Sequence, residues 1–230
     1  MKRLILFVFF LSLFTATHAQ YYLRMGYDAG YYNMDNLDIL VKNYSSSRSW
    51  LDDPLDEIHL MHGPQAGIGR QFKNITAEAR WTGHYTLVSA TGTPPSGNTE
   101  TRYLRARDGI VSAEARYHPE RSRFGGGLSF DVTYFQTLTR LASAKKYTHF
   151  ERTTTAGFTA SACFLPLRKR FNLGITGYYH FSVGQAEIDK LWYYLDKPGY
   201  TGLSRDYFKV RPSHFGVSVV LLLASEKGND

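Results

Sequence analysis

The most constraining feature of this sequence is a set of about eight runs in which apolar and polar residues alternate. The run at 171–184 is the clearest, and its odd positions are mostly apolar: Phe171, Leu173, Ile175, Gly177, Tyr179, Phe181 and Val183. The even positions between them are mostly small or polar. Successive side chains of a β-strand point to opposite faces. Each run therefore predicts a strand with one apolar face and one polar face.

The N-terminal residues 1–19 have the pattern of a secretory signal peptide. Lys2 and Arg3 precede an apolar run at 4–14 that is too short to cross a bilayer as a helix. Thr17-His18-Ala19 fits a small-x-small cleavage site. We therefore expect 1–19 to be removed, with 20–230 forming one exported domain. An exported chain is a poor candidate for binding nucleic acid, although its net charge is +7.

The links between the alternating runs are in turn short and long. The runs predict strands near 21–30, 58–72, 75–89, 101–117, 124–134, 147–165, 171–184 and 215–223. Short turns are expected at 73–74, 118–121 and 166–170, and four longer links join the remaining strands. Such alternation is typical of bacterial outer-membrane barrels. We predict an all-β protein, an eight-stranded antiparallel up-and-down transmembrane β-barrel with both termini in the periplasm.

Aromatic residues mark the expected edges of the apolar band. Phe124 and Tyr134 share one face and are ten residues apart. Ten residues at about 3.3 Å each, tilted by about 40°, rise about 25 Å, which is the height of such a band. The predicted lipid-facing girdle consists of Phe72, Tyr117, Phe124, Tyr134, Phe164, Phe171 and Phe181.

Cys163 is the only cysteine, so no internal disulfide stabilises the domain.

The polar faces of the same strands place many charged residues inside the expected barrel. The predicted lumen charge network consists of Arg24, Asp28, Glu78, Arg80, His84, Glu114, Arg116, Asp131 and His180. An eight-stranded barrel is just wide enough to be filled by its own side chains, so these charges should pair across the lumen. A catalytic or conducting lumen is the alternative, in which His84, His180, Ser182 and Asp131 would converge. No motif spacing selects them, so we expect no catalytic residue, no metal and no cofactor.

Two of the long links carry patterns of their own. Apolar residues in 33–44 recur at helical spacing, which predicts a short amphipathic helix capped by Asn33 or Asp35. That helix either packs on the rim of the barrel or docks a partner. Trp192, Tyr193 and Tyr194 are interpreted either as a partner contact or as a loop folded over the mouth. An acidic patch follows, which consists of Asp52, Asp53, Asp56 and Glu57. It is interpreted as a solvated loop, and a divalent-ion role at the lipopolysaccharide surface is the alternative, for which no fixed ligand spacing is present.

Four local features carry a resemblance to a known family. They are the Ala19-Gln20 junction, Met25-Gly26-Tyr27, the helix in the first long link, and Phe124-Gly125-Gly126-Gly127-Leu128. With these, the chain resembles the small outer-membrane β-barrel proteins of Gram-negative bacteria, the OmpX-like and OmpA-transmembrane-like barrels. The resemblance implies a monomeric barrel surrounded by membrane lipids and lipopolysaccharide.

The sequence is less specific about the task of the protein. We expect a structural or interaction barrel that acts through its outer loops, as an accessory subunit beside another envelope protein. A lipid- or peptide-modifying membrane enzyme and a narrow pore are the alternatives. A soluble secreted barrel is a further alternative, because alternation alone does not say which face lies inside.

Overall fold

The computed structural model describes residues 20–119, 122–165, 171–195 and 205–224. Eight long strands form its wall: β1 (Gln20–Tyr32), β3 (Leu60–Phe72), β4 (Ile75–Gly92), β5 (Glu100–Tyr117), β6 (Phe124–Leu141), β7 (Thr148–Phe164), β8 (Phe171–Ser182) and β11 (His214–Ala224). The predicted signal peptide lies outside the described residues, as does the short turn at 166–170.

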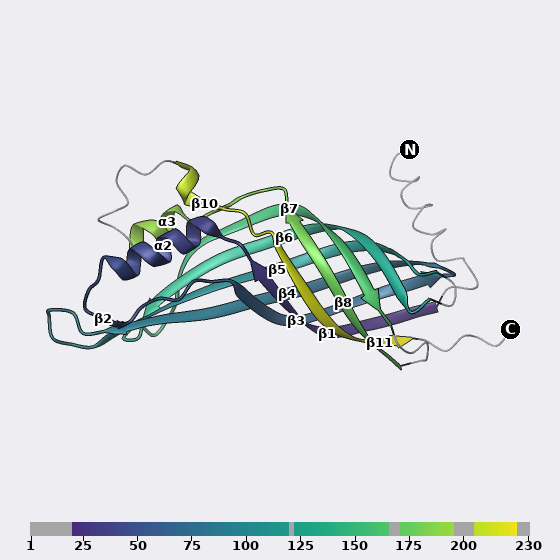
Figure 1. Cartoon of the computed structure of the whole chain (residues 1–230), viewed down its shortest axis with the longest axis horizontal. Helices are drawn as coiled ribbons and strands as arrows, with labels where there is room; N and C mark the ends of the chain where they lie inside the picture. Colours follow the sequence, from purple (N-terminus) through teal and green to yellow (C-terminus); the bar gives the residue numbers. More distant parts are fainter. Residues whose placement is uncertain (1–19, 120–121, 166–170, 196–204, 225–230) are drawn as a thin grey trace.

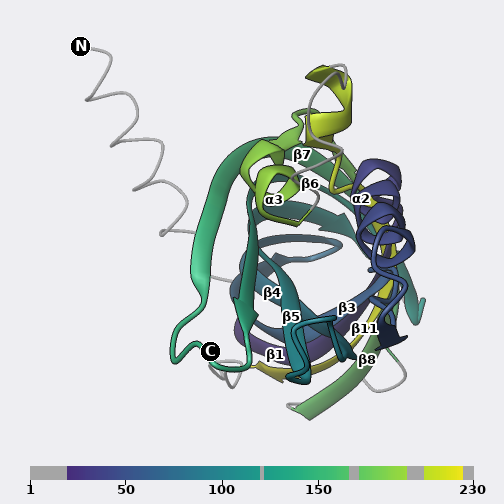
Figure 2. The same ribbon diagram turned by 90° about the vertical axis from the view of Figure 1, so that its left-hand side faces the viewer.

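The eight strands close into a ring (Figures 1 and 2). Each strand pairs antiparallel with its neighbour along the chain, and β1 closes the ring by pairing with β11. In that last pair Tyr22 lies opposite Ala224 and Tyr32 lies opposite His214. The predicted fold class, an eight-stranded antiparallel barrel with a short helix in the first long link, is confirmed.

One end of the barrel carries a very short connection between two strands. β3 and β4 are joined by the two-residue turn of Lys73 and Asn74, with Phe72 opposite Ile75. Lys73 has a φ of 45°, which the tight hairpin requires and which a side chain with a Cβ adopts reluctantly. Gln20 pairs with Gln71 in this region, so the first strand begins at the same end.

The strands of one side of the wall are longer than the sequence predicts. β6 continues to Leu141, seven residues beyond the predicted end at Tyr134. Beyond Tyr134 the apolar positions change sides, since Phe135 and Leu138 are buried inside the barrel. A rule that expects apolar residues only on the outer face therefore ends the strand too early.

A cap of helices and short strands lies on the rim at the other end of the barrel (Figure 2). It contains the helices α2 (Asp35–Ser46) and α3 (Asp189–Leu195) and the 3₁₀ helix η1 (Arg205–Phe208). The short strands β2 (Leu51–Asp53), β9 (Ala186–Glu187) and β10 (Lys209–Val210) complete it, with β2 on β4 and β9 on β10. Among the described residues, no helix has the length and apolar character needed to cross a membrane.

The cap and the upper barrel wall share one apolar core. Its buried members come from the cap, from the ends of the strands and from the links: Tyr32, Met34, Leu37, Leu40, Val41, Tyr44, Leu55, Ile58, Met61, Ala90, Leu104, Ala106, Phe135, Ala186, Ile188, Leu191, Trp192, Leu195 and Val210. The predicted amphipathic helix therefore exists and turns its apolar face into the mouth of the barrel.

One prediction about the cap is wrong, and for Trp192 the structure favours the second of the two interpretations given above, a loop folded over the mouth. The residue before α2 is Met34, and no side chain caps the helix, so neither Asn33 nor Asp35 has the expected role. Trp192 is fully buried against Phe208, at 6.1 Å between ring centroids, so it is not available as a partner contact. The reason is that α3 lies flat over the mouth and its apolar side faces the core. Tyr193 and Tyr194 remain exposed.

Candidate functional site

The structure places all nine residues of the lumen charge network on the inner face of the barrel. Eight of them are buried, and the Arg80 side chain is 10% exposed. Of the seven girdle residues, Tyr117, Phe124, Tyr134 and Phe181 are exposed on the outer face. Phe72 and Phe164 are half-buried, and the side chain of Phe171 lies outside the described set. The inner residues form three clusters.

The first cluster is built around two acids that face each other. Glu78 on β4 pairs in register with Glu114 on β5, an arrangement of like charges that is unfavourable by itself. Arg80 and Arg116 contact Glu114 at 2.7 and 2.9 Å, and Arg24 of β1 lies 3.6 Å from Glu78.

Neutral donors complete this cluster. The hydroxyl of Tyr22 donates to Glu78 at 2.7 Å, and that of Ser161 donates to Glu114 at 2.6 Å. Two carboxylates are therefore surrounded by three guanidinium groups and two hydroxyls, which is what a buried charge cluster needs to be stable.

The second cluster lies nearer the cap and is centred on a histidine. His84 Nε2 lies 2.7 Å from Asp28, and its Nδ1 lies 2.8 Å from Asp108. The hydroxyl of Tyr32 donates to Asp108, and that of Tyr178 donates to Asp28. Both nitrogens of the imidazole thus have acidic partners, and both acids have a further donor.

Sequence reasoning missed four members of this cluster. Asp108 occupies an even position on β5, as do the inward-facing Glu114 and Arg116, and Tyr178 occupies an even position on β8, as does His180. This shared parity, odd or even, was the signal that could have identified Asp108 and Tyr178. Tyr32 and His214 face each other in the β1–β11 register and stack at 4.1 Å. No pattern in the chain signals that contact.

The third cluster surrounds Asp131. Its carboxylate accepts hydrogen bonds from Thr159 at 2.6 Å and from Ser129 at 2.8 Å, and lies 3.0 Å from His180 Nδ1. Ser182 lies apart from this carboxylate, because its hydroxyl donates to the carbonyl of Gly184 at 3.0 Å. Of the four residues that an enzyme would bring together, only Asp131 and His180 are in contact, while His84 pairs with other acids.

The space left in the lumen is small. A cavity of about 20 Å³ lies between the clusters and is lined by groups such as Asp28, Arg80, His84, Tyr178 and His180. That volume accommodates about one water molecule. The side chains around this cavity bond to one another, as in the contacts of Asp28 with His84 and Tyr178.

The outer face of the barrel changes from apolar to charged along the length of β5. On β5, the residues toward the turn end are apolar outside, as at Val111 and Tyr117, whereas Arg105 and Arg107 point outward nearer the cap. On the inner face the order is reversed, since Glu114 is near the turn and Leu104 and Ala106 are under the cap. The polarity of the two faces therefore inverts within a single strand.

Arginines lie at this inversion, next to aromatic rings. Arg107 is in register with Gln136, which is in register with Arg152, so the three form a row across β5, β6 and β7. We call Arg105, Arg107, Arg152 and Arg211 the arginine tier. The guanidinium carbons of three of them lie over rings: Arg105 over Tyr85 at 5.6 Å, Arg152 over Tyr134 at 5.0 Å and Arg211 over Phe181 at 5.7 Å.

Comparisons with known proteins find similarity at the level of structure. No family model matches the chain, and no curated protein is similar to it in sequence. The chain is similar to Neisserial surface protein A, with a TM-score of 0.45, 9% identity, and coverage of 89% of this chain and 97% of that one. It is also similar to Ail, the attachment invasion locus protein of Yersinia pestis, solved with the heparin analogue sucrose octasulfate. That match has a TM-score of 0.44, 11% identity, and coverage of 88% and 99%.

The strand pairing and ring closure described above establish the eight-stranded antiparallel barrel for this chain.

Proposed function

We propose that this chain is an outer-membrane barrel whose apolar belt sits in lipid and whose capped outer half is an interaction surface. The observation that carries the proposal is the direction of the side chains. Phe130, Ile175 and Val219 are about half exposed on the outer face (50%, 50% and 49%), while Glu78 and Arg116 are buried at 5% and 3%. A soluble barrel has the opposite arrangement, with apolar residues inside.

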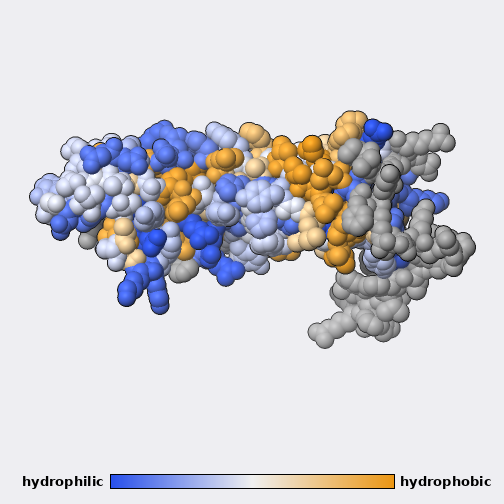
Figure 3. All heavy atoms as spheres, turned by 90° about the horizontal axis from the view of Figure 1, so that it is seen from below, coloured by the Kyte–Doolittle hydropathy of each residue, from blue (hydrophilic) through white to orange (hydrophobic). Residues whose placement is uncertain are grey.

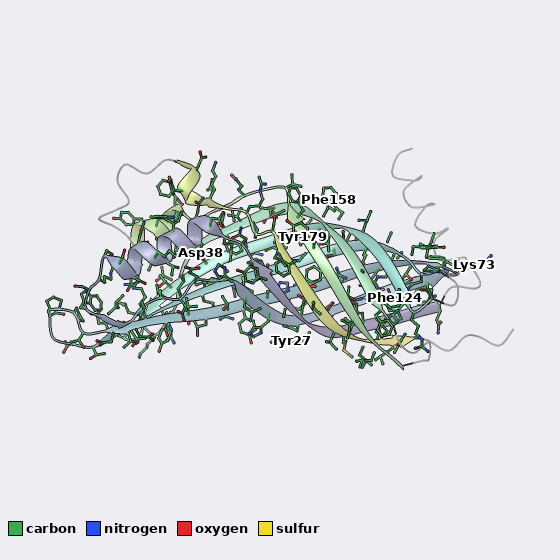
Figure 4. All side chains as sticks on the ribbon, viewed as in Figure 1. Tyr27, Asp38, Lys73, Phe124, Phe158 and Tyr179 are labelled. Atoms are coloured by element: carbon green, nitrogen blue, oxygen red, sulfur yellow. The ribbon has the colours of Figure 1, made fainter. Side chains whose placement is uncertain are left out.

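On the face that Figure 3 shows, apolar residues gather toward the turn end of the barrel. Exposed apolar side chains come from strands all around the ring, among them Leu23, Met25, Ile68, Ile75, Trp81, Val111, Leu128, Phe130, Phe158, Leu173, Ile175, Val217 and Val219. Surface apolar patches of this extent are rare on proteins that live in water. Figure 4 shows Phe124 near the turn, with Tyr27, Phe158 and Tyr179 further along the barrel. The half that carries the cap extends beyond the belt.

The interior supports an interaction role over a pore or an enzyme. The cavity between the charge clusters holds about 20 Å³, which suits a water molecule and is far smaller than the pockets that take a lipid or a peptide. The cap adds a shared apolar core across the mouth. The outward surface of the cap, including Tyr193 and Tyr194, then remains as the part that another envelope protein contacts.

Cell fractionation and gel mobility test the membrane assignment. The chain should be found in the outer-membrane fraction, and the unheated protein should migrate differently from the boiled protein. Recovery in the soluble periplasmic fraction would contradict the proposal.

A photo-crosslinking residue at Tyr193 or Tyr194 should capture an envelope protein, while one at the buried Trp192 should not. A barrel that is recovered alone from both positions would argue against the interaction role.

The arginine tier suggests the lipid that borders the barrel. Three arginines of the tier lie over aromatic rings. In the proposed orientation this level would face the phosphate groups of the outer leaflet, and basic residues near an anionic surface contribute about 1 kcal/mol each. We propose that the tier contacts the phosphates of lipopolysaccharide. The double variant Arg107→Gln/Arg152→Gln should retain several-fold less lipopolysaccharide through detergent purification than the wild type. Lys145→Gln/Lys146→Gln removes the same charge from an exposed loop and should not change retention. Equal losses in both variants would contradict the contact.

A further inference from the structure

Three potential metal ligands meet where α2 packs beside the segment that enters β3. Asp38 comes from the first turn of α2, and Glu57 and His59 come from the chain just before Leu60. One ligand atom from each lies within 4.8 Å of the others. The cluster is in the cap, well separated from the turn end (Figure 4). We propose that Asp38, Glu57 and His59 form a binding site for a divalent transition-metal ion, with Zn²⁺ as the best fit.

Asp38 is the residue that makes this cluster unusual. It lies on the buried face of α2 together with Leu37, Leu40 and Val41, and only 7% of it is exposed. Its Oδ1 atom has no hydrogen-bond partner among the described residues. A buried carboxylate oxygen without a donor is a site where a cation is stabilised.

His59 supplies a ligand that is already held in place. Its ring stacks on Tyr31 at 5.2 Å, and its Nδ1 lies 3.9 Å from the Asp38 carboxylate and 3.3 Å from the carbonyl of Tyr32. Its Nε2 lies 2.8 Å from Glu57. A carboxylate that bonds to one ring nitrogen orients the imidazole and strengthens the other nitrogen as a ligand. Glu57 therefore acts either as a ligand itself or as the group that positions His59.

Charge and ligand chemistry select the ion. Asp38 and Glu57 carry two negative charges, and the nearby Lys42, 2.8 Å from Glu57, offsets one of them. A neutral imidazole with two carboxylates suits zinc and neighbouring transition metals, whereas Mg²⁺ and Ca²⁺ prefer oxygen ligands alone. The bound ion would join α2 to the start of β3 and so hold the cap on the barrel.

A zinc titration tests the site directly. The tag-free mature barrel in detergent micelles, stripped of metal by a chelator, is titrated with Zn²⁺ by calorimetry. One saturable site per chain is expected, with Mg²⁺ binding at least tenfold more weakly. Asp38→Asn and His59→Gln should each weaken Zn²⁺ binding by at least tenfold. His62→Gln should leave it unchanged, because His62 lies on the β3 wall and contacts Tyr27 instead of the cluster.

The heat-dependent gel shift shows whether each variant is folded, and hydrogen exchange supplies a second measurement. Zinc should slow exchange of the α2 amides in the wild type and in His62→Gln, and should not do so in His59→Gln. The proposal is overturned if the wild type shows no saturable Zn²⁺ binding. It is also overturned if Asp38→Asn and His59→Gln bind as the wild type does, or if binding instead depends on the exposed Asp52 and Asp53.

Discussion

At the scale of the residue, the lumen shows how a barrel wall tolerates buried charge. The β4–β5 register puts Glu78 directly opposite Glu114, and the repulsion is offset because Arg80 and Arg116 reach the same carboxylate from either side. The cluster is therefore a unit in which each group depends on the others. Removing one cation leaves a buried negative charge unpaired, which costs more than the ion pair contributes.

Arg80→Met should lower the free energy of unfolding by about 3–5 kcal/mol, because Glu114 loses its 2.7 Å partner. Adding Glu114→Gln should restore part of the loss, since the buried charge is then removed. Urea unfolding in detergent or lipid vesicles measures both values. Arg123→Met, at an exposed position near a turn, is the matched control and should cost little. A double variant less stable than Arg80→Met would contradict this account.

A second residue-scale prediction concerns the turn at Lys73, where φ is 45°. Asn adopts this left-handed region more readily than Lys, so Lys73→Asn should stabilise the barrel by about 0.5–1 kcal/mol. Lys73→Val should destabilise it, because a β-branched residue fits this conformation poorly. The same unfolding assay applies, and effects of equal sign in the two variants would show that turn strain does not matter.

At the scale of the element, α2 is held by packing and by a few specific hydrogen bonds. Asn36 donates to the carbonyl of Lys209 at 2.7 Å, and Arg48 donates to the carbonyl of Leu195 at 2.8 Å. Its apolar face fills the mouth through Leu40 and its neighbours. The barrel wall is held by its own hydrogen bonds between strands and by its own charge clusters. The cap and the wall should therefore unfold separately.

Leu40→Ala should therefore loosen the cap while the barrel stays closed. Replacing a fully buried Leu by Ala costs about 2–5 kcal/mol. Faster hydrogen exchange and faster proteolysis are expected in 35–46, with the heat-dependent gel shift retained. Asn43→Ala is the control, because Asn43 lies on α2 without being part of the apolar core. Loss of the gel shift in Leu40→Ala would show that the cap and barrel fold as one unit.

At the scale of the whole molecule, the membrane proposal makes the inversion of face polarity the feature that sets how deep the barrel lies in lipid. Below the inversion the outer face is apolar and the interior is charged, and beyond it the outer face carries arginine while the interior is apolar. The same strand is thus suited to lipid over one part and to water over the other. The two environments exchange sides because the cap excludes water from the upper interior.

The depth of a new charge should then decide its cost. Val219→Arg, in the apolar belt, should destabilise the barrel by about 2–4 kcal/mol in lipid vesicles. Leu87→Arg should cost about 0–1 kcal/mol, because Leu87 lies opposite Arg105 at the level of the arginine tier. Both side chains are about half exposed, so exposure alone predicts equal effects. Equal costs would place the membrane boundary elsewhere.

The strand pattern, the two-residue turn and the α2 helix were predictable from the sequence because each depends on residues close together in the chain. Parity alone selected the inward residues such as Arg24 and Asp131. It did not predict their partners, because the contact of Arg24 with Glu78, or of Asp131 with His180, depends on which strands become neighbours and in what register.

What the chain by itself determines is therefore local: periodicity, turns, and which residues share a face. Ring closure and the cap decided the rest. They put the apolar face outside in one half and inside in the other, they buried Trp192, and they brought Asp38 to His59. Each of these depends on long-range contacts that bury or expose a surface, and the spacing of residues along the chain does not predict such contacts.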